Sequence, residues 1–193
     1  MASPGHIEVS SSTHMLTSLA TGNPGLWKKL GNLESRIVST EIERIPISAP
    51  IYVSGLARSG STILLEMLAD HPDTCAHTYG DFPFLFTPVW WNMAMRLRPG
   101  KSDRMQERAH GDGIQINQSS PEAMEEMLWM AYFSYLHTAQ QSEILNAQTH
   151  ALEFEHFYRD HIKKILYLRK GSRYVAKANY NVTRIAYLLR LFP

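Results

Sequence analysis

The sequence has a single cysteine, almost no net charge and no long hydrophobic run. Cys75 alone cannot form an internal disulfide or a four-cysteine zinc site, and the nine histidines contain no H-x-x-x-H pair, so we expect no metal. The longest apolar-rich stretch, 82–95, is too short to span a bilayer and is interrupted by prolines. Residues 1–25 lack the apolar core of a signal peptide. We therefore expect a cytoplasmic protein without a membrane span.

What the sequence does contain is typical of a globular domain. The 193 residues are 44% hydrophobic and 19% charged, and 19 basic residues balance 18 acidic ones to a net charge of +1. This balance gives no reason to expect a nucleic acid partner. Residues 159–193, however, hold nine basic residues and one acid, a net charge of +8. Such a segment indicates either a polyanionic partner or solvated helix faces.

The chain divides into a loose N-terminal extension over residues 1–45, with one short helix near 26–38, and a domain over residues 46–193. Residues 49–54 form an apolar run with β-branched and aromatic side chains, typical of a buried strand. A glycine–serine loop follows, and then apolar residues at helical spacing over 61–69.

A second strand–loop–helix unit is predicted near the end of the sequence. Residues 173–177 read as its strand, and Asn181 is the expected cap of a helix with the inner face Val182, Ile185, Ala186 and Leu189. Two further helices are expected in between, one capped by Ser120 and running to about His137, the other over 154–166. The pattern predicts an α/β fold with a parallel sheet flanked by helices.

The first loop carries the most specific chemistry. Its residues, Gly55-Leu-Ala-Arg-Ser-Gly-Ser-Thr62, have the outline of a phosphate-binding P-loop, but Ser61 stands where the lysine is expected. The amides of Gly60, Ser61 and Thr62 can face one phosphate at the positive end of the helix dipole, while Arg58 adds a fixed charge. Without the lysine the loop suits a single phosphate better than a nucleoside triphosphate. A nucleotide kinase and a plain glycine–serine turn remain alternatives.

The stretch Arg58-Ser-Gly-Ser-Thr62 after a hydrophobic strand, followed by Leu64-Leu65 and His71-Pro72, resembles the 5′-phosphosulfate-binding loop of sulfotransferases. Members of that family transfer a sulfuryl group from 3′-phosphoadenosine 5′-phosphosulfate (PAPS). The stretch from Arg173 to Asn179 and the helix ending at Pro193 are similar to the family's second strand-and-helix unit. The resemblance implies a hydroxyl or amine acceptor on a small molecule, carbohydrate or lipid, and a reaction without a metal. It leaves the oligomeric state open.

The resemblance also implies roles for single residues. Arg58 matches the basic residue that stabilises charge on the leaving phosphate, and Lys177 matches a lysine near the transferring group; its alternative is an exposed lysine at a strand end. The donor cradle corresponds to Ser59, Gly60, Ser61, Thr62 and the amide of Ile63.

The sequence departs from the family in two places. Asn179 stands where members often have proline. The family's 3′-phosphate motif is expected beyond Pro193, so we expect either a domain truncated at its C-terminus or a role for basic residues within 159–190.

Sulfuryl transfer is an in-line displacement in which the acceptor is usually deprotonated. Asp81 is the preferred candidate for the base, with loop capping as its alternative. His77, His110 and Asp112 are further candidates, and the last two also fit a plain His-Gly-Asp-Gly turn. The aromatic stretches are interpreted as core or, alternatively, as an acceptor pocket containing Trp90, Trp91 and Trp129. A non-enzymatic polyanion-binding module around residues 159–193 is the alternative to an enzyme.

Overall fold

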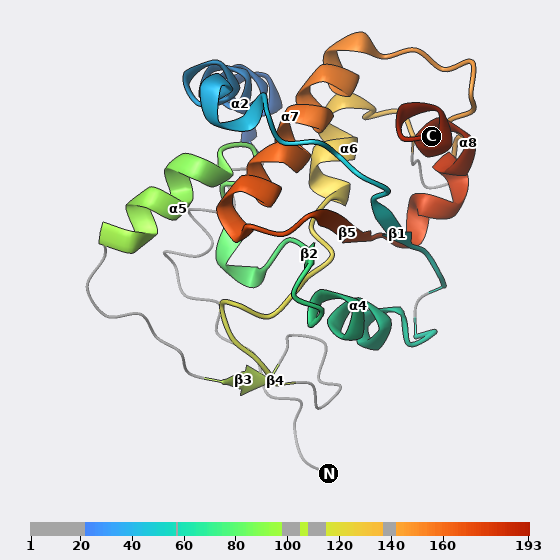
Figure 1. Cartoon of the computed structure of the whole chain (residues 1–193). Coiled ribbons are helices and arrows are strands. Elements are labelled where there is room, and N and C mark those ends of the chain that lie inside the picture. The colour runs from blue at the N-terminus through green and yellow to red at the C-terminus, as the bar shows by residue number, and fades with distance from the viewer. Residues whose placement is uncertain (1–21, 57, 98–104, 108–114, 137–141) are drawn as a thin grey trace.

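A small parallel sheet lies at the centre of the structure (Figure 1). This computed structural model describes residues 22–56, 58–97, 105–107, 115–136 and 142–193. The strands β1 (Ile51–Val53), β5 (Arg173–Lys177) and β2 (Thr74–Cys75) lie in the order β1-β5-β2, and both pairings are parallel. The two predicted strands are therefore confirmed, as is the α/β class. Strand β2 was not predicted, because two residues are too few to show a period.

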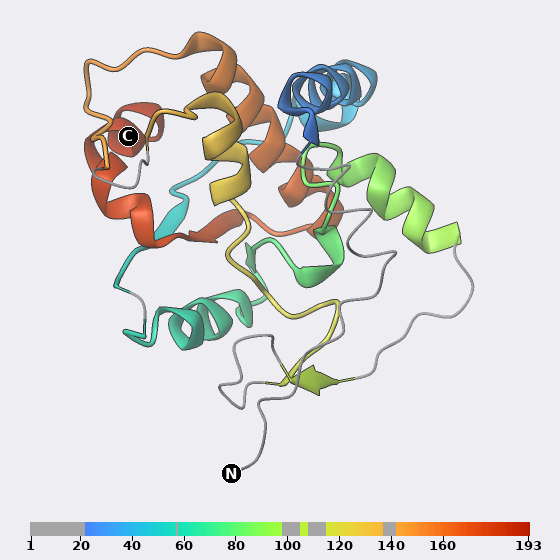
Figure 2. The ribbon, with the colours of Figure 1, turned by 180° about the vertical axis from the view of Figure 1, so that it is seen from behind.

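Helices cover both faces of this sheet, as Figures 1 and 2 show from opposite sides. Helix α4 (Ser61–Ala69) packs on one face and α7 (Leu152–Arg169) on the other. Under α4, Leu65 is buried against Val175 and Ala76 of the sheet layer. Both helices match their predicted ranges. The sheet is thus the middle of three layers, and β1 leads directly into α4.

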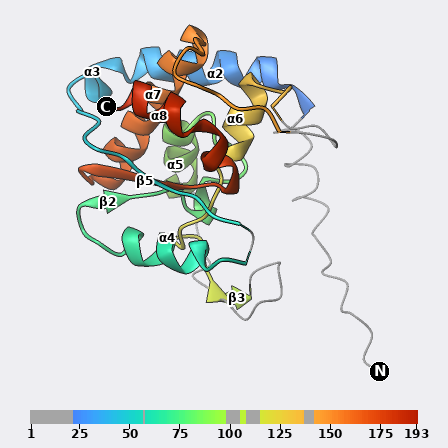
Figure 3. The same cartoon turned by 90° about the vertical axis from the view of Figure 1, so that its right-hand side faces the viewer.

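Further helices pack on the outer side of α7. Helices α2 (Pro24–Ile37) and α3 (Ser39–Ile42) both contact α7, and Figure 3 shows α2 lying across it. Lys164 Nζ donates a hydrogen bond to Glu34 Oε2 at 3.1 Å, and both side chains are fully buried. The predicted helix near 26–38 is confirmed as α2. The division of the chain at residue 45 stays a prediction.

Short elements complete the described chain. They are η1 (Tyr79–Asp81), α5 (Pro88–Leu97), β3 (Gln106–Glu107), β4 (Gln115–Ile116), α6 (Glu126–Tyr132), η2 (Asn179–Arg184) and α8 (Ile185–Leu191). Trp129 of α6 is fully buried in the main aromatic cluster, so it is core and not an acceptor wall. Among the described residues, no helix has the length and apolar character needed to cross a membrane.

The prediction that a helix starts at Ser120 was wrong. Helix α6 begins only at Glu126. The backbone before it pairs with the segment after β2 instead: Tyr79 N donates to Ser120 O at 3.0 Å, and Glu122 N donates to His77 O at 2.9 Å. The Ser120 amide and hydroxyl donate to Asn117 Oδ1. Local side-chain bonding thus replaces the cap that the pattern indicated.

The last predicted helix differs in its cap and in its buried face. Asn181 caps no helix; it lies inside the 3₁₀ helix η2, and its Nδ2 donates to Val53 O at 3.2 Å. Because α8 starts only after η2, the predicted inner positions point outward, and Val182, Ile185 and Leu189 are 62%, 54% and 63% exposed. The buried face is instead Tyr187, Leu188 and Leu191.

Candidate active site

The candidate site lies where the carboxyl ends of β1 and β5 meet. In the parallel register Val53 stands beside Lys177, so the loop after β1 and the segment after β5 start side by side. Three hydrogen bonds join the two chain segments: Ala178 N donates to Val53 O at 3.1 Å, Asn181 Nδ2 donates to the same oxygen, and Ser54 Oγ donates to Asn179 O at 3.2 Å. Ligands of open parallel sheets bind outside the carboxyl ends of the strands. The two segments that the sequence singled out are thus brought together by the sheet.

The loop itself has a backbone that only certain residues tolerate. Gly60 has φ +79°, and Arg58 has φ +67°, which is uncommon for a residue with a side chain. A Cβ on Gly55 would lie 2.6 Å from Ser59 Oγ, whereas a Cβ on Gly60 would meet no atom within 4 Å. The loop is therefore folded tightly against itself at Gly55 and open above Gly60. That open side is where a bound group has room to approach the backbone.

Helix α4 presents its N-terminus to the same space. Gly60 is its N-cap and supplies no side-chain hydrogen bond to the first turn. The first backbone hydrogen bond of the helix runs from Leu64 N to Gly60 O at 3.1 Å, so the amides of residues 61–63 precede that bond and lie at the positive end of the helix dipole. These amides and the helix dipole favour an anion. The residues present therefore fit the phosphate end of a donor.

A model of the sulfotransferase family matches residues 50–193, a span that contains the loop, α4, β5 and α8. The chain belongs to this family. The comparison with curated proteins and the comparison with solved structures found no match. The resemblance seen in the loop residues is therefore confirmed over most of the chain.

In this sulfotransferase, Lys177 occupies the last position of β5 and is half-buried. Within the described residues its ammonium group has no hydrogen-bond or ion-pair partner. Its Cα stands beside Val53, the residue after which the loop segment begins. Asn179, the departure from the family pattern, accepts the Ser54 hydroxyl with its backbone carbonyl, a bond that proline would also allow.

Asp81 lies apart from this loop, beyond β2 and in η1. Its carboxylate accepts two hydrogen bonds from Arg169 Nη2, at 2.8 and 2.7 Å, and one from Thr78 N at 2.9 Å. Burial alone would raise the pKa of Asp81, but the hydrogen bond and charge of His77 and the charge of Arg169 hold that pKa well below its usual range. A carboxylate held this way is a weak base. A catalytic role for Asp81 stays a prediction, and its contacts favour the loop-capping alternative.

His77, the second base candidate, is buried in a row of polar side chains. Its Nδ1 lies 3.2 Å from Asp81 Oδ2 and its Nε2 lies 2.9 Å from His161 Nε2. Burial holds the pKa of His161 well below its ordinary value, so that ring is neutral near pH 7. His110 and Asp112 lie outside the described residues.

Four of the nine basic residues in 159–193 are paired with carboxylates in the described part of the chain. These pairs are Lys164–Glu34, Arg169–Asp81, Arg184–Glu126 and Arg190–Glu155. The guanidinium of Arg184 also lies 4.2 Å from the centre of the Trp129 ring and is fully buried. Two of these four cations, Lys164 and Arg184, are fully buried, and Arg169 and Arg190 are partly exposed. That pairing weakens the alternative of a polyanion-binding module.

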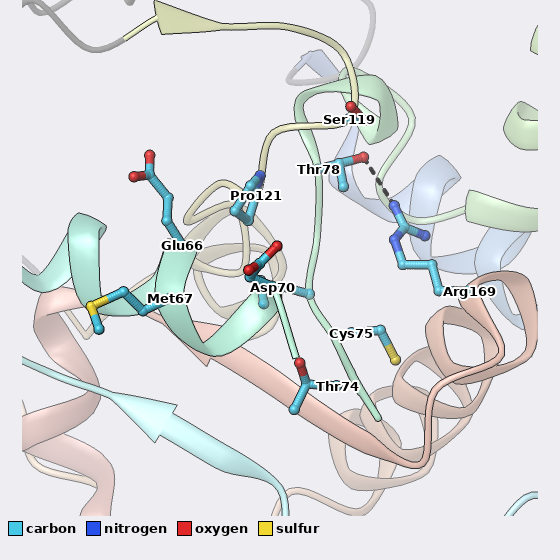
Figure 4. Close-up of a pocket in the computed structure, with 11 residues that line it drawn as sticks. Glu66, Met67, Asp70, Thr74, Cys75, Thr78, Ser119, Pro121 and Arg169 are labelled. Carbon is cyan, nitrogen blue, oxygen red and sulfur yellow. Dashed lines mark hydrogen bonds between the residues drawn. The ribbon is translucent and has the colours of Figure 1, made fainter. Parts of the chain in front are cut away.

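A cavity of about 690 Å³ opens beside α4 (Figure 4). Glu66 and Met67 of α4 and its C-cap residue Asp70 form one side, and the segment with Ser119 and Pro121 lies opposite. This cavity was not predicted from the sequence, because its walls come from four separate stretches of the chain. Its volume is in the range of small-molecule sites, about 300–1,000 Å³. Its α4 residues belong to the C-terminal half of the helix, whereas the candidate donor loop precedes the N-terminus of the same helix.

Proposed function

We propose that this sulfotransferase uses PAPS as donor and transfers its sulfuryl group to a hydroxyl or amine of a small-molecule, carbohydrate or lipid acceptor. The observation that carries the proposal is the loop between β1 and α4, with positive φ at Arg58 and Gly60 and an uncapped helix start. This geometry suits a single phosphate, and Ser61 offers no charge for a triphosphate. A cytoplasmic location remains the expectation from the sequence.

The proposed reaction is an in-line displacement at sulfur. The acceptor oxygen or nitrogen forms a bond to sulfur while the bond from sulfur to the bridging oxygen breaks, and the electron pair stays on 3′-phosphoadenosine 5′-phosphate. Negative charge therefore grows on the leaving phosphate. Arg58 in the loop after β1 and Lys177 at the end of β5 are the cations proposed to stabilise it, because the two strands end side by side.

The amides of Ser61, Thr62 and Ile63, with Gly60 and the Ser59 hydroxyl, are proposed to hold the 5′-phosphate. No metal is needed in this scheme, since the charge on the donor is met by amides and two side-chain cations. The acceptor is proposed to enter from the 690 Å³ cavity beside α4. Its proton leaves to a base whose identity stays open between Asp81 and the other candidates.

Calorimetric titration with 3′-phosphoadenosine 5′-phosphate tests the donor site directly. We expect binding to the natural chain, binding to the control variant Arg36→Ala, and loss of at least about tenfold in affinity in Arg58→Ala, as for a charged group that contacts phosphate. Arg36 suits the control because it is an exposed arginine on α2, distant in the fold from the loop.

The comparator is ATP with Mg²⁺. Preference for ATP–Mg²⁺ would overturn the PAPS proposal in favour of a phosphotransferase. Binding of 3′-phosphoadenosine 5′-phosphate that is unchanged in Arg58→Ala would show that the loop is not the donor site.

A further inference from the structure

A second, smaller cavity of about 320 Å³ adjoins the one beside α4. It lies among η1, α5 and the end of α7. Thr78, Ser119 and Arg169 line both cavities, so the two cavities adjoin at these three residues. The smaller cavity has no part in the donor site described above.

The two cavities differ in charge. Among the described residues, Arg96 and Arg169 line the smaller one together with one carboxylate, Asp81, so these side chains give it a net positive charge. The larger cavity has Glu66 and Asp70 against Arg169 and is net negative. An anionic group is therefore favoured in the smaller cavity and disfavoured in the larger one.

Arg169 is held so that it can bind such a group. All of its hydrogen bonds within the described part of the chain go through Nη2, to Thr78 Oγ1 and to both oxygens of Asp81. Its Nε and Nη1 hydrogens remain available, and its side chain is 19% exposed. Because the buried carboxylate fixes the guanidinium plane, the remaining donors are already oriented.

Arg96 supplies the second cation from a different element. It is exposed in the last turn of α5, and it has no partner among the described residues. One turn earlier, Asn92 lines the same cavity, and its Oδ1 is buried without a hydrogen-bond donor. An unsatisfied buried acceptor favours a ligand that brings a donor, such as a hydroxyl.

We infer that the smaller cavity binds the carboxylate of a sugar acid, with Arg96 and Arg169 holding the anion and Asn92 accepting from a neighbouring hydroxyl. This role rests on the proposed sulfuryl transfer: the smaller cavity anchors an anionic carbohydrate that is the acceptor. The rest of the acceptor then reaches past Thr78 and Ser119 into the larger cavity. Arg96 and Arg169 thereby determine acceptor specificity.

An NMR titration of the ¹⁵N-labelled chain with glucuronate tests this assignment. The indole N–H of Trp91 is a local reporter, because it donates to the carbonyl of Gly80, which lines the cavity. We expect a saturable shift of this signal with glucuronate, and weaker binding of both glucose, which lacks the carboxylate, and acetate, which lacks the hydroxyls. Arg96→Gln should weaken glucuronate binding by about fivefold, as for one exposed charged contact, and Arg36→Gln should not.

Equal affinity for glucuronate and glucose would overturn the inference, and so would unchanged binding in Arg96→Gln. The titration is repeated in Arg58→Ala, where binding should persist because Arg58 does not line this cavity. If glucuronate binds through Arg96 but 3′-phosphoadenosine 5′-phosphate does not bind, the PAPS proposal fails and the anion site stands. If 3′-phosphoadenosine 5′-phosphate binds but glucuronate does not, the anion site fails and the PAPS proposal stands.

Discussion

Replacing Glu34 by glutamine removes one half of a fully buried ion pair between α2 and α7. Glu34 Oε2 lies 3.1 Å from Lys164 Nζ, while Oε1 accepts the amide of Trp90 at 2.7 Å. A glutamine keeps the size and can still accept from Trp90, but its amide then places a donor against the ammonium group. Lys164 also donates to Gly31 O at 3.0 Å, which leaves that carbonyl as its remaining partner.

The expected loss is large. Breaking a buried pair by removing one partner costs about 3–5 kcal/mol, because the other charge stays buried without compensation. Burial already lowers the pKa of Lys164, against the opposing charge of Glu34, so loss of that charge makes the ammonium form less favourable still. For a chain of this size, about 4 kcal/mol corresponds to a fall in Tm of roughly 8–16 °C.

The assay is urea unfolding followed by tryptophan fluorescence, together with a thermal melt. Glu41→Gln is the matched control, since Glu41 is an exposed carboxylate on the neighbouring helix α3 and should change stability by less than about 0.5 kcal/mol. The double variant Glu34→Gln with Lys164→Met should regain part of the loss, because no unpaired charge remains. A Glu34→Gln protein as stable as the control would refute the reasoning, as would a double variant no better than the single one.

Two further outcomes are expected. Gly60→Ala should cost about 1–2 kcal/mol in the free energy of unfolding, because φ +79° places the new Cβ in the left-handed region although no atom crowds it. A stability within 0.3 kcal/mol of the natural chain in urea unfolding would contradict this. Asp81→Asn should flatten the acid side of the pH–stability curve. The pKa of Asp81 is lower in the folded protein than its unfolded value near 4, so the carboxylate stabilises the fold above about pH 4 and this stability is lost as the pH falls below it. The difference between the natural chain and Asp81→Asn should therefore be largest at pH 7 and should shrink below pH 4; a constant difference would contradict the ion-pair role.

The sequence alone was enough for the local features near the donor loop. Strand β1 and α4 follow from an apolar run and from helical spacing, both of which are short-range patterns. The need for glycine at positions 55 and 60 also follows from the loop motif, since a tight turn around a phosphate requires it. The family resemblance came from the loop and from the second strand-and-helix unit, and the family model confirms it over residues 50–193.

Only the tertiary structure decided which distant residues meet. The sequence shows Lys164 and Arg184 only as members of the basic segment 159–193. It does not show that they lie beside Glu34 and Glu126, because the pairing of buried charges depends on contacts between residues far apart in the sequence. The phase of α8 was likewise set by the 3₁₀ turn before it, which no periodicity shows. The two cavities that meet at Arg169 draw their walls from separate stretches of the chain, so their opposite charges arise only when the fold brings those stretches together.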